Sequence, residues 1–310
     1  MSTGVQIINT VLPVVLMLAI GMLCRQRKLL TREGIGALKS VVVNITLPAV
    51  MLNAFATMNY SGKNVILTLM MFGICLFGWI LGNGFRKIFR IESRFIPFLT
   101  TGFEAGMLGY SLFILLYGQE RIGTFASIDL GQVLFVFTLY KILLGMNGQE
   151  KVTAKELLSE MLHSPTMIAI LAGVLLGATG IYRALQPSGI STVIDACTDF
   201  VSAPTSAIIL LTIGYDLELK EISWSAVWKA AAFRMVIMAV LRVLAGLAVR
   251  TFGMGSSLDH ALNVMFILPP PYVLPVFADE EQQRAYISSS ISVLTVLTII
   301  GFILLAVWGI

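Results

Sequence analysis

The chain has 310 residues, of which 57% are hydrophobic and only 12% are charged, and its mean hydropathy is +0.89. A soluble globular domain carries about 25% charged residues, so this composition excludes a water-soluble globular protein and predicts a membrane protein. The net charge of +4 could indicate nucleic-acid binding, but the basic residues cluster in short loops beside apolar stretches, and we expect no nucleic-acid partner.

Apolar stretches of about 20 residues, each long enough for one crossing of a bilayer, recur along the whole chain. They predict an all-α polytopic membrane protein with ten transmembrane helices. The first stretch has no basic residue before it and no convincing cleavage site, so it is predicted to be an uncleaved span rather than a signal peptide. The predicted spans are residues 5–24, 37–57, 64–85, 96–117, 127–145, 165–181, 191–215, 224–251, 258–278 and 286–309.

Basic residues gather in alternate connections between these spans. The side that holds the first, third, fifth, seventh and ninth connections carries 14 lysines and arginines, and the other side carries 4. Lys141, Arg234 and Arg242 are left within spans or near their ends. By the positive-inside rule the richer side faces the cytoplasm, so both chain ends are predicted to lie outside a cell (inner or plasma) membrane.

The longest connection, residues 147–164, is predicted to be a cytoplasmic linker between two halves, residues 1–146 and 165–310. Residues 31–52 can be laid beside residues 186–208, which indicates an internal repeat. With five spans each, the halves have opposite orientations, a common plan of secondary transporters, whose sites form from interrupted helices at the bilayer midplane. The matched residues are Gly34-Ile35 with Gly189-Ile190, and Pro48 within one position of Pro204.

Two predicted spans contain residues that interrupt a helix. The ninth contains three consecutive prolines at 269–271, and the fourth contains Gly102, Gly106 and Gly109, with Glu104 among them, at a matching depth. Free backbone groups in hydrocarbon cost several kcal/mol each, so such breaks are tolerated only where protein or a water-filled cavity surrounds them. We expect the two breaks to face each other and form a site, with amides that favour anions and carbonyls that favour protons or cations.

Glycine pairs four residues apart have a second interpretation, because such pairs also allow membrane helices to pack closely. For Gly78xxxGly82 and Gly173xxxGly177 we prefer close packing. Gly102xxxGly106 could also be a packing motif, although it coincides with the predicted break.

Residues 268–302 resemble the end of the auxin efflux carrier family, which includes plant PIN-type auxin carriers and bacterial malate and malonate permeases. Residues 44–55 resemble its second helix and residues 102–120 its fourth, and a weaker similarity extends over nearly the whole chain. The family is similar in fold to bile-acid/sodium symporters. The resemblance implies two inverted five-helix repeats, helices four and nine that cross at their breaks, and a homodimer. It also implies a scaffold of helices one, two, six and seven, against which the transport helices, three to five and eight to ten, move like an elevator.

The chain departs from the family at the fourth helix. Family members commonly carry Asn-Thr-Gly-Phe-x-Gly-x-Pro across that break, and the stretch matched to it here is residues 104–111. In this match Glu104 replaces the asparagine and Ser111 replaces the proline. The glycines that permit the break are kept, so we expect an intact crossing with altered ligand chemistry.

Polar and interrupting residues at the crossing are the candidates for solute binding. An ionised carboxylate near the bilayer centre must be paired, hydrated or protonated, so Glu104 is also the leading candidate for coupling transport to protons. If it stays charged, dicarboxylates become poorer substrates than neutral or cationic solutes. Asn44 and Thr205 can offer hydrogen bonds to a cavity or to neighbouring helices. The candidate binding residues are Glu104, Gly106, Gly109, Tyr110, Ser111, Pro269, Pro270, Pro271, Tyr272, Asn44 and Thr205.

Three further charged residues are candidates for ion coupling: Arg234, Arg242 and Asp199. The arginines lie eight residues apart on roughly one helical face, so one could pair with Glu104. Alternatively, both snorkel or hold span eight to its neighbours. Asp199 shares a face with Asp195, and a pair that favours a helix N-terminus is the simpler interpretation.

These features predict a secondary active transporter of a small organic solute, most favourably an organic acid, driven by a proton gradient, by solute exchange or by an electrical gradient. The alternative is a nontransporting sensor that has kept the fold. We expect no enzyme, because Gly214-Tyr215-Asp216 superficially resembles a membrane-protease motif without a second suitable aspartate. We also expect no cofactor and no metal, because neither cysteines nor histidines have ligand spacing. These residues are Cys24, Cys75, Cys197, His163 and His260.

Overall fold

The computed structural model describes residues 3–91, 93–147, 159, 162–217, 224–255, 257–278 and 280–308. These residues form helices joined by short connections, and no strand occurs among them. The helical elements are α1 (Thr3–Gln26), α2 (Arg32–Val41), η1 (Val42–Thr46), α3 (Leu47–Thr57), α4 (Gly62–Ile88), α5 (Ile96–Leu99), η2 (Ala105–Gly109), α6 (Tyr110–Tyr117), η3 (Gln119–Arg121), α7 (Ile122–Phe135), η4 (Val136–Tyr140), α8 (Lys141–Asn147), α10 (Pro165–Ala178), α11 (Ile181–Ala184), α12 (Ile190–Ser202), α13 (Thr205–Asp216), α14 (Trp224–Thr251), α15 (Ser257–Ile267), η5 (Leu274–Phe277) and α16 (Glu281–Trp308).

Seven helical segments in the described ranges are long and apolar enough to cross a membrane, and two apolar helices, Ala105–Tyr117 and Pro165–Ala178, are shorter. The chain is therefore an all-helical multi-pass membrane protein, as the sequence predicts. The inverted repeat, the membrane orientation and the homodimer stay predictions, and the linker at 147–164 lies largely outside the described residues. The long segments are Ile7–Gln26, Arg32–Thr57, Gly62–Ile88, Gln119–Gly145, Ile190–Asp216, Trp224–Thr251 and Glu281–Trp308.

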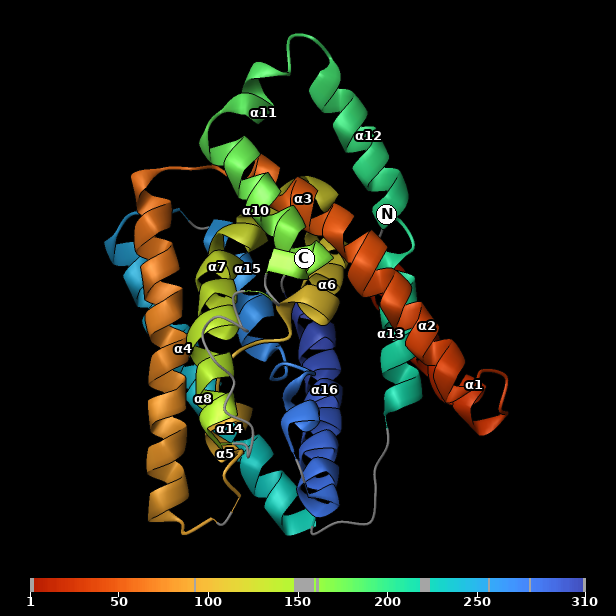
Figure 1. Ribbon diagram of the computed structural model, residues 1–310, viewed down its shortest axis with the longest axis vertical. Helices are drawn as coiled ribbons and strands as arrows, with labels where there is room; N and C mark the ends of the chain where they lie inside the picture. The colour runs from red at the N-terminus through yellow and green to blue at the C-terminus, as the bar shows by residue number, and fades with distance from the viewer. Residues whose placement is uncertain are drawn as a thin grey trace.

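The helices pack as two sets of neighbours. In one set α1 lies along α13, while α3 lies along α10 and also contacts α12. In the other set α4 packs against α5 and α7, and α14 packs against α4, α15 and α16. Figure 1 shows α1 and α13 together along one side of the molecule, with α4 on the opposite side. Contacts between α3 and α7 join the two sets.

Glycines allow several of these helices to approach closely. A Cβ added at Gly82 of α4 would lie 2.7 Å from the Cα of Pro97, and one at Gly78 would lie 3.2 Å from the Thr100 carbonyl oxygen. On α10, a Cβ added at Gly177 would lie 2.8 Å from the carbonyl oxygen of Phe55. The close packing predicted for Gly78xxxGly82 and Gly173xxxGly177 is therefore confirmed, since Gly173 also faces backbone of α3.

The fourth and ninth predicted spans are interrupted where the sequence places glycine and proline. Helix α5 ends at Leu99 and helical structure resumes at Ala105, while α15 ends at Ile267 and the next helical turn begins at Leu274. Gly102, inside the first interruption, has a φ of +67°, a conformation that side chains disfavour. Both interruptions therefore leave backbone groups without partners inside a helix, and these groups need partners elsewhere.

We predict that Gly82→Leu destabilises the protein and that Gly84→Leu, two residues along the same helix, does not. The new side chain at position 82 would meet the backbone of residue 97, whereas the Cβ at position 84 meets nothing within 4 Å. Overpacking costs about 1–3 kcal/mol, and surface changes usually stay within about 0.5 kcal/mol. Thermal unfolding of both purified variants in one detergent measures the difference, and equal midpoints would contradict the close contact.

Candidate functional site

The two interrupted helices meet at their breaks. The backbone N–H of Glu104 donates a hydrogen bond to the carbonyl oxygen of Pro269 at 2.9 Å. Phe103 packs edge-on against Phe266, with ring centroids 5.3 Å apart. Gly102 has a positive φ, and a Cβ added there would lie 3.1 Å from the ring of Pro271, so glycine favours this approach over larger residues. The segments at 100–104 and 268–273 therefore form one crossing.

Arg234 of α14 supplies the hydrogen-bond donors for the free carbonyls of both breaks. Its side chain is only 2% exposed. A helix C-terminus carries partial negative charge, so one buried guanidinium stabilises the ends of α5 and α15 together. Its acceptors are the carbonyl oxygens of Leu99 at 2.8 Å, Gly102 at 2.8 Å, Leu268 at 2.9 Å and Thr101 at 3.4 Å.

Glu104 supplies the acceptors for free amides on the other side of the same breaks. One carboxylate oxygen accepts from the backbone N–H of Tyr272 at 2.6 Å, and the other accepts from the backbone N–H of Met107 at 3.3 Å. Amides at such half-helix starts favour negative charge. Glu104 forms no ion pair within the described ranges, so the pairing with Arg234 or Arg242 that the sequence left open is absent.

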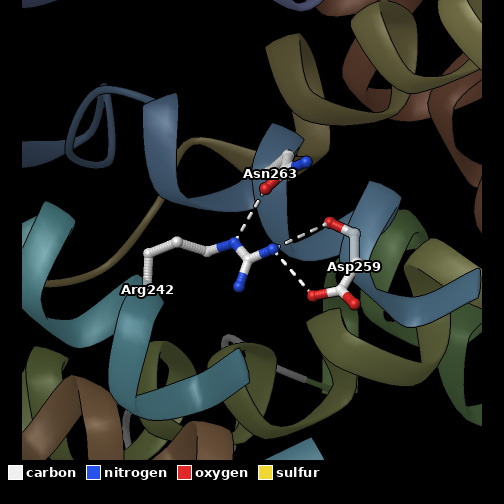
Figure 2. Close-up of polar contacts among 3 residues, drawn as sticks. All are labelled: Arg242, Asp259 and Asn263. Atoms are coloured by element: carbon white, nitrogen blue, oxygen red, sulfur yellow. Dashed lines mark hydrogen bonds and ion pairs between the residues drawn. The ribbon is translucent and has the colours of Figure 1, made fainter. Parts of the chain in front are cut away.

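Arg242 ties two helices together. Its Nε donates to Oδ1 of Asn263 at 2.8 Å, and its Nη2 forms an ion pair with Oδ1 of Asp259 at 2.8 Å. Figure 2 shows the guanidinium between these two side chains, both of which belong to α15. Arg242 therefore holds span eight to the first half of span nine, which was one of the two roles that the sequence left open.

A cavity of about 770 Å³ extends from the crossing to a basic rim. Its lining at the crossing includes Glu104, Pro271 and Tyr272. At the other end it includes Arg25 and Arg32, together with Lys39, which forms an ion pair with Asp216. The rim lies at the end of the helices that the charge tally predicts to face the cytoplasm.

Three π-helical turns contribute to the wall of this cavity. Val43 comes from η1, Met107 from η2 and Phe137 from η4. A π turn adds a residue to the helical repeat, and such turns are frequent at functional sites. The three turns belong to different helices and all line the same cavity. The irregular helix geometry is therefore concentrated around this cavity.

Comparison with known proteins identifies the family of this chain. The profile of the family described as membrane transport protein matches residues 6–308, nearly the whole chain. The chain belongs to this family. It is the auxin efflux carrier family that the sequence resembles. An uncharacterised transporter of Methanocaldococcus jannaschii is 23% identical over 318 residues, which cover 97% of this chain and 97% of that protein.

The observed break changes how the family pattern fits this transporter. Because Gly102 takes the left-handed conformation at the break, the Asn-Thr-Gly-Phe part of the pattern fits residues 100–103 better than residues 104–107. Thr100 then replaces the asparagine, and Thr-Gly-Phe is kept. In this alternative match Glu104 falls on the variable position after the phenylalanine, while the second glycine and the proline of the pattern fall on Ala105 and Met107.

Asp129 of α7 is a site residue that the sequence analysis did not single out. Its side chain is 1% exposed and lines the large cavity. Its Oδ2 accepts from the hydroxyl of Tyr110 at 3.1 Å, and its Oδ1 accepts from Nε2 of Gln132 at 3.2 Å. An aspartate in the middle of the apolar run FASIDLGQVLF carries the same signal that selected Glu104, and that signal could have found it.

The predicted binding residues divide between two cavities. Gly106 lines the large cavity together with Glu104, Pro271 and Tyr272, while Pro269 and Pro270 are buried in the crossing. A second cavity, of about 280 Å³, is also lined by Gly106 and by Leu47, which therefore separate the two. Four other predicted residues line this second cavity: Tyr110, Ser111, Thr205 and Asp199.

Besides Pro269 and Pro270, two more predicted binding residues lie outside both cavities, Gly109 and Asn44. Gly109 is a packing position, because a Cβ added there would lie 2.7 Å from Leu268 and 2.9 Å from Phe125. Asn44 is exposed and donates to the carbonyl oxygen of Ser40 at 2.9 Å. Neither belongs to the linings around the crossing.

We predict that Arg234→Met lowers the stability of this transporter by several kcal/mol and that Arg250→Met, on the exposed last turn of the same helix, does not. Each buried carbonyl that loses its donor costs about 1–3 kcal/mol, and Arg234 serves four carbonyls. Thermal unfolding and the yield of monodisperse protein measure the effect. Equal behaviour of the two variants would show that the breaks do not need the guanidinium.

Proposed function

We propose that this transporter is a secondary active carrier that binds a small organic acid in the large cavity, moves it across the membrane and couples this movement to a cation. The observation that carries the proposal is the cavity itself, which joins a basic rim to the crossing of two interrupted helices. Positive charge around an opening raises the local concentration of anions and speeds their capture. The crossing lies where interrupted-helix transporters hold their solutes.

The contacts at the crossing restrict where a carboxylate of the solute can bind. Glu104 already accepts from the amides of Met107 and Tyr272, which an incoming carboxylate would otherwise use. A solute carboxylate is therefore expected toward Arg25 and Arg32, with the rest of the solute against the crossing. The phenol of Tyr272, whose hydroxyl is 3.1 Å from Oγ1 of Thr295, offers a polar contact there.

An elevator-type motion fits the two sets of helices. We assign α1–α3 and α10–α13 to the scaffold, and α4–α8 and α14–α16 to the transport group, because each helix packs chiefly within its own set. The crossing belongs to the transport group, whereas Leu47, which lines both cavities, belongs to the scaffold. Sliding of the transport group past Leu47 would carry the crossing from the large cavity toward the smaller one.

Uptake by proteoliposomes of a panel of labelled organic acids, with and without an imposed proton gradient, tests the proposal. We expect at least one acid to accumulate, because cavity and basic rim favour small anions. Binding of an acid by the purified protein without uptake under any gradient would contradict transport and favour a sensor that keeps the fold. Accumulation only of cationic solutes would contradict the organic-acid class.

We predict that the double variant Arg25→Gln/Arg32→Gln lowers uptake at low acid concentration, and that Arg27→Gln/Lys28→Gln lowers it much less. Both double variants remove the same charge near the first connection, but only the first pair lines the cavity. Electrostatic capture can contribute about tenfold or more to an on-rate and weakens in high salt. Equal losses in both variants would assign the effect to general surface charge.

We predict that Gly106→Phe blocks uptake while the protein still folds. A Cβ at this position meets only Leu47 at 3.7 Å, so a side chain can be accommodated but would fill the boundary between the two cavities. Gly84→Phe, whose Cβ meets nothing within 4 Å, is the matched control. Elution as a monodisperse peak establishes folding, and unchanged uptake by the position-106 variant would show that solutes do not pass this boundary.

A further inference from the structure

Asp129 is a buried carboxylate without a compensating charge. It lies in the middle of the continuous helix α7, so no helix start is available to stabilise it. Its two acceptor contacts come from neutral groups, the hydroxyl of Tyr110 and the amide of Gln132. It forms no ion pair among the residues that the structure describes. An uncompensated carboxylate at this depth is expensive, so it needs a cation or a proton.

Gln132, one helical turn further along α7, adds an oxygen that lacks a donor. Its side chain is 4% exposed, and its Nε2 donates both to Oδ1 of Asp129 at 3.2 Å and to the carbonyl oxygen of Phe103 at 3.0 Å. Because both donor contacts fix the amide, its Oε1 stays a buried acceptor without a hydrogen-bond partner. Both side chains line the large cavity, so a small ion from the cavity can reach them.

The groups that face Asp129 from neighbouring helices do not supply positive charge. Tyr110 comes from α6, the carboxylate of Glu104 from the residue just before η2, and the buried thiol of Cys75 from α4. The guanidinium of Arg234 donates to the carbonyls of the two breaks and forms no ion pair with Asp129. The surroundings of Asp129 are therefore rich in oxygen acceptors and poor in cations.

We propose that Asp129 and Gln132 form the binding site of the small monovalent cation, a proton or Na⁺, that drives solute movement. The proposal rests on the transport function proposed above and names the residues of its coupling site. A proton would bind a carboxylate oxygen of Asp129 and give Gln132 Oε1 the donor that it lacks. Sodium would take oxygens from Asp129 and Gln132, with the unwound carbonyl of Phe103 beside them, as coupling ions do at interrupted helices.

The contacts of this cation site lead directly to the crossing. Gln132 donates to the carbonyl of Phe103, which adjoins Glu104, and Tyr110 begins the helix that follows the fourth-span break. The two amides that Glu104 accepts from lie at helix starts, which stabilise a negative charge, whereas Asp129 lies in the middle of α7 without such a start beside it. We therefore assign coupling to Asp129 instead of Glu104, which was the leading candidate from the sequence.

The first test measures cation binding without any solute. Thermal unfolding of the purified transporter is followed at fixed pH with NaCl against choline chloride, and in choline chloride across the neutral pH range. We expect a rise of the midpoint with Na⁺ if sodium binds, or a midpoint that depends on pH if a proton binds. Asp129→Asn should lose that response, while Glu104→Gln and the exposed control Glu120→Gln should keep it.

Different outcomes separate this site from the transport function. A response lost in Asp129→Asn but kept in Glu104→Gln supports the site even if no tested acid is taken up. A wild-type midpoint indifferent to both Na⁺ and pH, or a response equal in wild type and Asp129→Asn, overturns it even if uptake occurs. If Asp129→Asn does not fold, Gln132→Leu replaces it, and an unchanged response in that variant also overturns the site.

Discussion

The structure depends on how the backbone groups freed by two helix breaks are satisfied inside a membrane protein. Arg234 donates to carbonyls from both breaks, and Glu104 accepts from amides beyond both breaks. Arg234 and Glu104 form no ion pair with each other, although one is basic and the other is acidic. One guanidinium at the carbonyl ends and one carboxyl group at the amide ends allow the chain to be irregular at a depth where water cannot satisfy it.

This capping explains the arrangement of the remaining site. Once the free amides and carbonyls are satisfied, the crossing can form one wall of the cavity without exposing uncompensated backbone groups. The three π-helical turns widen neighbouring helices around it, and Arg25 and Arg32 make the far end positive. The result is a cavity with acidic residues at one end and basic residues at the other, which suits the joint transport of an anion and a cation.

Much of the architecture could be predicted from local sequence signals, because each has a direct physical cause. Three adjacent prolines cannot continue a helix, and Gly102 permits a conformation that other residues disfavour, so both breaks were predictable. The hydrogen-bond and ion-pair partners of the charged side chains could not be predicted in this way. Whether Arg234 contacts Glu104 or carbonyls depends on how α14 packs against the crossing, and single-chain spacing carries no information on this packing.

Two further site residues show the same limit. Asn44 is polar and near a proline, yet its side chain contacts its own helix instead of the cavity. Asp129 lies in a span without a predicted break, so no interruption of the helix pointed to it, although its position in an apolar run was informative. Composition identifies which residues are costly in a membrane, while the packing of distant helices decides which of them share a site.

The position of Glu104 has a consequence for the unloaded state. In some carriers the amides of the broken helices could depend on a bound anion for their hydrogen bonds. Without the anion these amides would be unsatisfied, and the empty protein would change conformation slowly. Such a carrier would favour obligatory exchange of one solute for another. Here the amides of Met107 and Tyr272 already have an acceptor that belongs to the chain. Under the proposed transport mechanism, the empty carrier would keep its backbone satisfied, so its return would not require a solute travelling in the opposite direction.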